Sequence, residues 1–291
     1  MFKITEKRVL APNIYLHDIE APRVARSAQP GQFIILRVNE KGERIPLTIT
    51  DYDTTKGTVT IVVQVVGAST KMIAGHEKGD SFLDFVGPLG RPSEFIHLTP
   101  GQLKEQKILF VAGGVGTAPV YPQVKWLSMN GIRPDVIIGA KTSEFLIMTE
   151  EMKQVAGEVF IATDDGTAGF KGMVTNLLKD LVVNQKRSYN HVIAIGPMIM
   201  MKFVSMLTQK LNIHTTVSLN TLMVDGTGMC GACRVSVGNK TYFTCVDGPE
   251  FDGHLVNFDE AMRRQVMYKT IEERKAKQHD EDGFKCPVGL S

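Results

Sequence analysis

The sequence has few cysteines and none before residue 230. Its four cysteines, at positions 230, 233, 245 and 286, are too few and too clustered for the disulfide framework of a secreted protein. An excess of one charge is also missing, because 33 Lys and Arg against 31 Asp and Glu leave a net charge of +2. This balance predicts no nucleic-acid partner and no anionic membrane partner.

Long hydrophobic runs are absent too. The longest, such as ILFVAGGVG, are interrupted by glycine and fall short of the roughly 20 residues that span a bilayer. The N-terminal MFKITEKRVL alternates like a strand and has no apolar signal core. We therefore expect a cytoplasmic protein with no membrane partner. A chain of 291 residues, 43% hydrophobic and 22% charged, is long enough for about two globular domains.

Residues 1–98 have the pattern of an all-β domain. Short segments rich in β-branched residues follow one another, several of them alternating, and Pro-Gly and Lys-Gly turns separate them. The predicted strands are KITEKRVL, IYLHDIE, QFIILRV, IPLTITDY, TVTIVVQVV and SFLDFVGPL. This spacing predicts an antiparallel β-barrel.

The pattern changes at about Thr99. Through residue 222, buried strand runs such as KILFVAGGVG alternate with helical segments such as APVYPQVKWLSMNG. That alternation predicts an open parallel α/β sheet, with TTVSLNTLM as its closing strand. The remaining chain divides into a cysteine module at 223–258 and, at 259–291, a charged amphipathic helix and a polar tail.

Three predicted strands end in glycine-bearing turns. They are Gly113-Gly114-Val115-Gly116, Asp164-Asp165-Gly166 and Gly196-Pro197-Met198. Such strand ends favour a nucleotide crevice, because small residues let the backbone and a helix N-terminus approach a diphosphate. The alternatives are a plain tight turn for the first, and a helix cap or solvated turn for the two aspartates.

The predicted barrel has a candidate site of its own. Arg44 and Thr48 lie around an apolar strand, and Ser69 and Thr70 follow a glycine. Hydroxyls, backbone amides and an arginine at a strand end suit a pyrophosphate. The same residues are equally compatible with an ordinary barrel rim.

The loop that carries Cys230, Cys233 and Cys245 is the strongest motif. Plant-type [2Fe-2S] ferredoxins space their ligands as C-x4-C-x2-C…C, and counting back from Cys230 by that rule reaches Asp225. Glycines at 226, 228 and 231 let the loop wrap closely. We therefore predict Asp225 as the fourth ligand, and a carboxylate should depress the cluster potential somewhat.

Other interpretations of these residues stay open. Three thiolates and one carboxylate also suit a structural zinc ion, and Cys-x-x-Cys suits a reactive redox pair. His254 is a conceivable ligand, although a solvated loop histidine fits its position as well. Cys286, in the polar tail, is interpreted as an incidental free thiol.

Taken together, these residues resemble the ferredoxin-reductase superfamily. Pro30-Gly31-Gln32-Phe33, Gly87-Pro88-Leu89-Gly90, GGVGTAP and DGTGMCGAC…C-V-D-G-P-x-F are similar to its motifs. Over residues 1–260 the chain resembles the branch with a C-terminal [2Fe-2S] module. That branch includes the electron-transfer subunit of dihydroorotate dehydrogenase B and the small subunit of NADH-dependent reduced ferredoxin:NADP+ oxidoreductase. The aspartate at the first cluster position is similar to the latter, whereas the former resembles four-cysteine ligation.

The resemblance implies FAD in the barrel, NAD(H) on the α/β domain and a [2Fe-2S] cluster, and it implies no catalytic side chain. The implied FAD-binding residues are Pro46, Leu47, Thr48, Ile49, Gln64, Val65, Val66, Gly67, Ser69, Thr70, Gly87 and Pro88. The implied NAD-binding residues are Gly113, Gly114, Val115, Gly116, Thr117, Ala118, Pro119, Asp164, Asp165, Gly166, Gly196, Pro197 and Met198. This chain departs from the family at one position, because Ile45 stands directly before Pro46 where related flavoproteins have an arginine. Arg44 is one residue earlier, and because side chains alternate along a strand it would point to the opposite face.

The function implied is that of an electron-transfer subunit in an electron-bifurcating NADH-dependent ferredoxin:NADP+ oxidoreductase. A large flavoprotein subunit with its own FAD and [4Fe-4S] clusters would be the partner, through which ferredoxin and NADP(H) react. An apolar face around the cluster and the tail helix would dock that subunit. The alternatives are the electron-transfer subunit of NAD-dependent dihydroorotate dehydrogenase and, in a different class, a zinc-stabilised non-enzymatic binding module.

Overall fold

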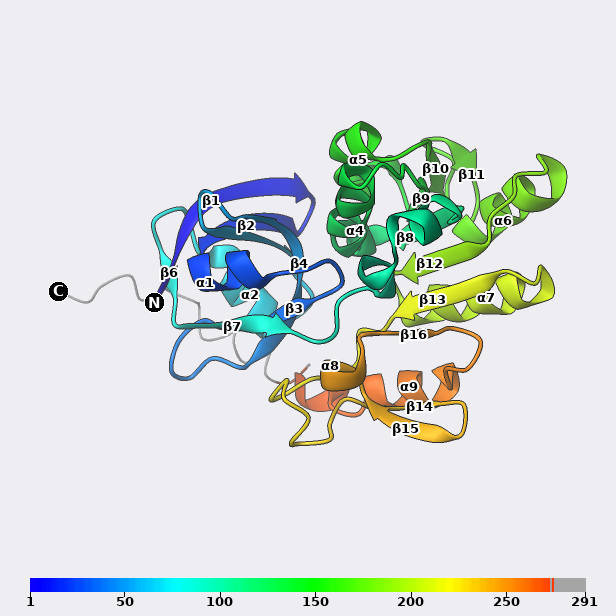
Figure 1. Cartoon of the computed structure of the whole chain (residues 1–291). Helices are drawn as coiled ribbons and strands as arrows, with labels where there is room; N and C mark the ends of the chain where they lie inside the picture. Colours follow the sequence, from blue (N-terminus) through cyan, green and yellow to red (C-terminus); the bar gives the residue numbers. More distant parts are fainter. Residues whose placement is uncertain (273, 275–291) are drawn as a thin grey trace.

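The computed structural model describes residues 1–272 and 274 of the chain. Figure 1 shows the barrel, in blue to cyan, beside the α/β sheet, in green to yellow, with the orange segment that follows the cysteine loop below both. The positions of these three parts relative to one another place the candidate sites.

The N-terminal part is a nearly closed antiparallel barrel. Within the described residues its seven strands follow the order β6-β1-β2-β5-β4-β3-β7. β6 and β7 are the two edge strands of this sheet, and only Leu83 separates them in the chain. The N–H of Leu83 donates to the carbonyl oxygens of Arg37 and Val38, which brings the two edge strands together. The elements are β1 (Phe2–Ala11), β2 (Ile14–Glu20), α1 (Pro22–Ser27), β3 (Phe33–Arg37), β4 (Ile45–Asp53), β5 (Thr58–Gln64), α2 (Ala68–Gly75), β6 (Ser81–Phe82) and β7 (Asp84–Leu89).

The second part is an α/β sheet with helices on both faces. Its strand order is β11-β10-β9-β8-β12-β13-β16, and every residue of the central strand β8 is buried, as expected for a parallel strand covered on both faces. The strands are β8 (Ile108–Gly113), β9 (Asp135–Ala140), β10 (Val159–Thr163), β11 (Phe170–Lys171), β12 (His191–Ile195), β13 (His214–Ser218) and β16 (Glu250–Asp252). The helices are η1 (Glu94–His97), α3 (Pro100–Lys104), η2 (Gly114–Gly116), α4 (Thr117–Met129), η3 (Ser143–Phe145), α5 (Thr149–Val155), α6 (Val174–Lys179), η4 (Asp180–Asn184) and α7 (Met198–Lys210).

The predicted closing strand is wrong in one respect. TTVSLNTLM is a strand only up to Ser218, and β13 does not end the sheet. β16 returns from beyond the cysteine loop and pairs antiparallel with β13, with Val217 opposite Phe251. An unpaired β13 edge would expose backbone donors and acceptors, and β16 covers it. The sheet is therefore mixed rather than parallel throughout.

The cysteine segment follows β13. After an irregular loop the chain forms a hairpin, a short helix, β16 and a final amphipathic helix: β14 (Arg234–Val237), β15 (Lys240–Phe243), α8 (Thr244–Asp247) and α9 (Phe258–Gln265). The tail helix predicted beyond Asp259 is interrupted, since residues 266–268 form a turn before helical residues resume at 269. The rest of that predicted tail, Cys286 included, lies outside the described residues.

The barrel core contains a histidine, which predicts a pH-dependent stability. His17 is 0% exposed beside Phe82, and burial lowers the pKa of His17 to about 4. Because the unfolded chain takes up this proton near pH 6.5 and the folded chain only near pH 4, stability is lost as pH falls through that window. From pH 7.5 to pH 4.5 this group should remove roughly 2 to 3 kcal/mol from the free energy of unfolding.

Urea unfolding of the wild type and of His17→Leu at the two pH values measures this loss. The variant should lose less stability between them, by about the stated amount. An equal loss in both proteins would show that His17 does not carry the effect.

Candidate functional site

Of the residues predicted to bind FAD, those on strands lie on β5, β4 and β7, in the stretch of sheet ordered β5-β4-β3-β7. β3 is in the middle, because Phe33 is paired with Thr48 on one side and with Leu89 on the other. Pro46, Leu47 and Thr48 are partly exposed on β4, and Ile49 is buried. The structure therefore brings the β4 run and the Gly87-Pro88 turn to opposite sides of one strand.

The other predicted FAD residues end β5 and begin α2. Gly67 is the N-cap of α2, and the hydroxyl of Thr70 accepts hydrogen bonds from the N–H groups of Val66 (2.9 Å) and Gly67 (3.1 Å). The Ser69 hydroxyl donates to the Glu43 carboxylate at 2.6 Å. Since both hydroxyls have partners, the first-turn backbone amides of α2 are the better donors for a pyrophosphate.

Arg44 has a role that the sequence did not reveal. Its Nε donates to the carbonyl oxygen of Val224 at 3.1 Å, and its Nη2 donates to that of Asp225 at 3.2 Å. The side chain thus ties the residue directly before β4 to the cysteine loop rather than lying ready to clamp a pyrophosphate. The two segments are 180 residues apart in the chain, so spacing alone carried no signal of the contact.

The glycine turns after β8 and β12 touch each other. A Cβ atom on Gly116 would lie 2.3 Å from the carbonyl oxygen of Ile195, and one on Gly196 would lie 3.0 Å from the Cα of Gly113. The chain then enters α4 at Thr117. Only residues without a side chain allow this approach, and it leaves the N-terminus of α4 at the carboxyl edge of the sheet, where nucleotides bind.

The aspartates predicted for the same crevice lie farther along that edge. Asp164 and Asp165 follow β10, which β9 separates from β8. Both are exposed, and the Asp165 carboxylate accepts hydrogen bonds from the N–H (3.0 Å) and hydroxyl (2.7 Å) of Thr167, which lower the pKa of Asp165. Asp165 therefore caps a turn, and its contact with a ribose stays a prediction.

The glycine turn packs against the barrel. Val115 and Ala118 belong to one apolar cluster with Leu16 of β2 and Val62 of β5. An ion pair of 2.7 Å between Lys125 of α4 and Asp51 of β4 joins the two parts as well. The turn predicted to bind the nucleotide therefore packs near the end of β5, close to the predicted FAD residues at positions 64–67.

The cysteine loop holds two buried thiols and one exposed thiol. The sulfur atoms of Cys233 and Cys245 are 3.3 Å apart, and Cys230 is exposed. The Asp225 carboxylate accepts hydrogen bonds from the N–H groups of Thr227 (2.8 Å) and Cys230 (3.0 Å) and from the Thr227 hydroxyl, which hold the pKa of Asp225 far below its usual range. The loop glycines at 226, 228 and 231 have φ of 81°, 86° and 64°, as a tight wrap requires.

This donor set fits an iron–sulfur cluster chemically. Burial and the neighbouring Cys233 raise the pKa of Cys245 to about 12, so a cation is needed to hold the Cys245 thiol as a thiolate. Within residues 1–272 and 274, no three His, Cys, Asp or Glu side chains are grouped closely enough to hold one metal ion. That criterion concerns a single ion such as zinc, whereas a [2Fe-2S] cluster divides its four ligands between two irons.

The buried cysteines pack against the barrel strand β3. Cys233 and Cys245 form an apolar cluster with Phe33, Ile35 and Met223. The backbone approach is close, since a Cβ atom on Gly226 would lie 2.5 Å from the Cδ1 of Ile35. The loop thus lies on the strand between the two runs predicted to bind the flavin.

Sequence reasoning missed Glu250. One carboxylate oxygen, Oε1, accepts hydrogen bonds from the Ser93 hydroxyl and the Gln123 side-chain amide, both at 2.9 Å, and burial raises the pKa of Glu250 to about 7. Glu250 is the variable position of D-G-P-x-F, and its partners are 157 and 127 residues away in the chain. No local pattern signals such a contact.

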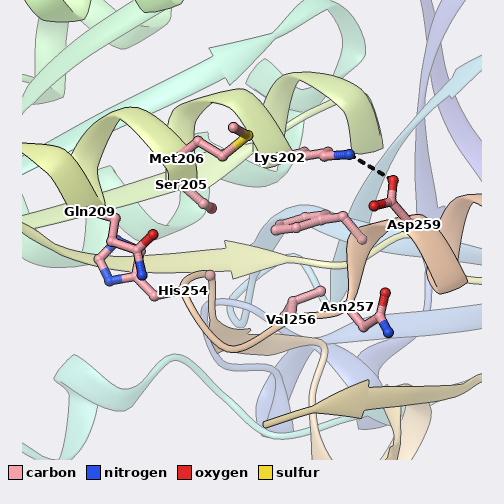
Figure 2. Close-up of a pocket in the computed structure, with 10 residues that line it drawn as sticks. Lys202, Ser205, Met206, Gln209, His254, Val256, Asn257 and Asp259 are labelled. Atoms are coloured by element: carbon pink, nitrogen blue, oxygen red, sulfur yellow. Dashed lines mark hydrogen bonds and ion pairs between the residues drawn. The ribbon is translucent and has the colours of Figure 1, made fainter.

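A surface groove of about 200 Å³ lies between α7 and residues 253–259, and Figure 2 shows its lining side chains. Lys202 and Asp259 form an ion pair of 2.6 Å across its end. His254 lines the groove, and its Nε2 is 3.1 Å from the Thr208 hydroxyl, so it packs on α7 instead of facing the cysteines. The predicted FAD, NAD and cluster residues do not line this groove. We interpret it as the packing boundary between α7 and the segment that leads to α9.

Apolar side chains of the cysteine loop and of the residues that follow it are exposed. Met229 is 89% exposed, Val224 at the start of the loop and Val246 directly after Cys245 are exposed too, and so is Leu255. The turn after α9 adds Val266, Met267 and Tyr268. None of the helices in the described part of the chain has the length and apolar character needed to cross a membrane.

Comparison with known proteins identifies the family. Residues 220–257 match the iron-sulfur cluster binding domain of dihydroorotate dehydrogenase B, and residues 110–206 match the oxidoreductase NAD-binding domain. A Thermotoga maritima protein described as a dihydroorotate dehydrogenase B (NAD(+)) electron transfer subunit homolog is 43% identical, covering 93% of this chain and 92% of that protein. This chain belongs to the dihydroorotate dehydrogenase B electron-transfer subunit family.

Two further proteins are similar over nearly the whole chain. A Clostridium beijerinckii protein described as an uncharacterized protein in the adh 3' region is 62% identical, over 97% of this chain and 95% of the relative. A chain solved in a study of flavin-based electron bifurcation by the NADH-dependent reduced ferredoxin-NADP oxidoreductase is 40% identical. It superposes with a TM-score of 0.89, over 97% of this chain and 98% of that one.

Proposed function

We propose that this chain is the small electron-transfer subunit of an electron-bifurcating NADH-dependent ferredoxin:NADP+ oxidoreductase. The observation that carries the proposal is the packing of buried Cys233 and Cys245 on β3, between the β4 and β7 runs assigned to the flavin. Similarity to the bifurcating reductase structure over nearly the full length supports it.

Each cofactor has a matching set of residues. We assign FAD to the β4 run Pro46–Ile49, the N-terminus of α2 and the Gly87-Pro88 turn, and NAD(H) to the Gly113–Pro119 turn and its neighbours. When bound, FAD supplies hydride exchange with the nicotinamide, and a [2Fe-2S] cluster on Asp225, Cys230, Cys233 and Cys245 supplies single-electron transfer. The chain's own residues bind and orient these groups, and we assign no side-chain acid, base or nucleophile.

The packing supports one spatial order for the three sites. The glycine turn packs on the β2 and β5 side of the barrel through Val115 and Ala118. The cysteines pack on β3, farther along the same sheet, where β4 alone separates β3 from β5. The flavin strands therefore lie between the nucleotide crevice and the cluster loop, as a path from nicotinamide to flavin to cluster requires.

We propose a large flavoprotein subunit with its own FAD and [4Fe-4S] clusters as the partner, through which ferredoxin and NADP(H) react. The exposed apolar side chains of Val224, Met229 and Val246 form the docking face, since burial of such a patch favours association. The names of several relatives favour a second candidate, dihydroorotate dehydrogenase. Purification of the native complex, followed by identification of the second subunit, discriminates between the two.

Cofactor analysis of the purified protein tests the proposal. We expect one FAD, two irons and two inorganic sulfides per chain, with the visible absorption of a flavin and a [2Fe-2S] cluster. About one zinc ion and no inorganic sulfide would instead support the zinc-stabilised binding module and overturn the electron-transfer assignment.

We expect NAD(H) to bind more tightly than NADP(H). After β9 the chain offers Lys141 as a cation. The N–H of Asp165 donates to the Lys141 carbonyl oxygen at 3.3 Å. This hydrogen bond keeps the exposed carboxylates of Asp164 and Asp165 beside Lys141. Like charges there disfavour a 2′-phosphate, and the affinity for NADH should exceed that for NADPH by about tenfold or more. Equal dissociation constants in a binding titration would contradict this preference.

A further inference from the structure

Three arginines, each from a different part of the chain, bind the backbone beside the predicted cluster ligands. Arg44 directly precedes β4 of the barrel, Arg91 follows β7, and Arg264 is in α9. Each guanidinium donates to a carbonyl oxygen of the cysteine loop or of the residue directly after Cys245. We call Arg44, Arg91 and Arg264 the arginine clamp.

Arg44 holds the start of the cysteine loop. Its guanidinium donates to the carbonyl oxygens of Val224 and of Asp225, the predicted first ligand. The next residue, Gly226, is so close to β3 that a Cβ atom there would lie 2.5 Å from the Cδ1 of Ile35. The barrel therefore fixes the first ligand both through its own carbonyl group and through the residue that follows it.

Arg264 reaches the middle of the loop from α9. Its Nη2 donates to the carbonyl oxygen of Ala232 at 3.0 Å, and Ala232 lies between the predicted ligands Cys230 and Cys233. Helix α9 lies beside β14 (Figure 1) and shares an apolar cluster with it. Because β14 begins directly after Cys233, this packing keeps Arg264 next to the ligand pair.

Arg91 binds the residues after the last ligand, and it does so at the surface. Its Nε donates to the carbonyl oxygen of Val246 at 3.3 Å, and its guanidinium lies 3.8 Å from the Asp247 carboxylate. The Arg91 side chain is 71% exposed, whereas Arg44 and Arg264 are partly buried. Water and the carboxylate therefore screen the charge of Arg91 most. The carbonyl oxygens bound by the other two arginines are neutral, so those contacts leave the cationic charge uncancelled.

We propose that the arginine clamp holds the ligand-bearing backbone in place and raises the reduction potential of the cluster. Reduction adds one negative charge to a cluster whose four ligands are already anionic, and a cation held beside a ligand favours that charge. The clamp thus offsets the lowering of the potential expected from the Asp225 carboxylate. Its members are positioning residues, since they act through the backbone and through their charge. This inference deepens the proposed function and rests on it for the cluster itself.

Redox titration of the cluster-loaded full chain at low ionic strength tests the electrostatic part, with EPR of the reduced cluster as the readout. Arg44→Gln and Arg264→Gln should each favour the oxidised cluster about tenfold, which lowers the potential by about 59 mV for a one-electron couple. Arg44→Lys and Arg264→Lys keep the charge, so they should stay within about twofold of the wild type. Arg91→Gln should shift the potential less, because that charge is exposed and lies near Asp247.

Arg263→Gln is the matched control on α9. Arg263 is exposed and adjacent in sequence to Arg264. Its replacement removes the same charge from the helix while the Arg264 contact stays in place, so the potential should not change. Unchanged potentials in both Arg44→Gln and Arg264→Gln, or an equal shift in Arg263→Gln, would overturn the proposal.

Two further measurements keep the test decisive if a glutamine variant retains too little cluster to titrate. At the exposed Arg91, replacement by Gln and then by Glu should lower the potential in two steps, and three equal potentials would contradict the proposal. Hydrogen exchange at residues 224–246 of the cluster-free chain should be faster in Arg44→Gln and Arg264→Gln than in Arg263→Gln, because hydrogen bonds that hold this backbone are lost. Equal exchange in all three variants would also overturn it. A wild type that binds no cluster would instead refute the proposed function, and hydrogen exchange would still decide whether the clamp holds the loop.

Discussion

Replacing Asp225 with alanine is expected to strip the [2Fe-2S] cluster from the protein or leave it labile. The carboxylate has two functions in our assignment: it supplies the fourth ligand, and it holds the loop closed through the N–H groups of Thr227 and Cys230. Loss of both should lower the retained iron and sulfide by about tenfold to a hundredfold. Iron and sulfide analysis, together with visible absorption, measures the loss.

Two more substitutions separate the ligand from the loop contact. Asp225→Asn keeps an oxygen that can accept the Thr227 N–H but removes the anionic ligand, so it should also lose the cluster. Asp225→Cys should retain a cluster, with more thiolate-like absorption and a shifted reduction potential, because ligand softness rises while the charge on the iron changes little.

Cys286→Ser is the control for this series, since Cys286 is the fourth cysteine of the chain. It should leave the cluster intact. If Cys286→Ser loses the cluster while Asp225→Ala keeps an unaltered spectrum, Asp225 is not the ligand and Cys286 is.

Replacing Gly116 with alanine is expected to abolish NAD(H) binding and destabilise the α/β sheet. A Cβ atom at this position would lie 2.3 Å from the carbonyl oxygen of Ile195 and 2.9 Å from the Cα of Gly196. Both are backbone atoms, so the glycine ends of β8 and β12 must move apart. The free energy of unfolding should fall by about 3 kcal/mol, and the N-terminus of α4 should shift from the crevice.

Urea unfolding and NADH titration measure the two effects, and Gly101→Ala is the matched control. Gly101 is in α3, has no left-handed φ and has open space where a Cβ would be placed. Alanine there should leave nucleotide affinity unchanged and stability equal or slightly higher. Unaltered NADH affinity in Gly116→Ala would show that the glycine turn is not the nucleotide site.

Local patterns predicted the barrel strands well. IYLHDIE corresponds to β2 from Ile14 to Glu20, although its burial does not alternate strictly, since the neighbours Leu16 and His17 are both buried. SFLDFVGPL is divided into β6 and β7 at Leu83, which closes the barrel and which no alternation could indicate. A strand's period is set by its own residues, whereas closure depends on which edges meet.

The sequence by itself determined the order of barrel, α/β sheet and cysteine segment, the glycine-bearing strand ends, and the spacing that makes Asp225 the expected fourth ligand. These features are local, because residue spacing encodes period, turn and ligand reach within a few residues. Only the tertiary structure decided that Arg44 binds the cysteine loop, that β16 completes the α/β sheet, and that Glu250 joins three parts of the chain. Each of these contacts links residues far apart in the chain, and such contacts form only where separately folded surfaces pack together.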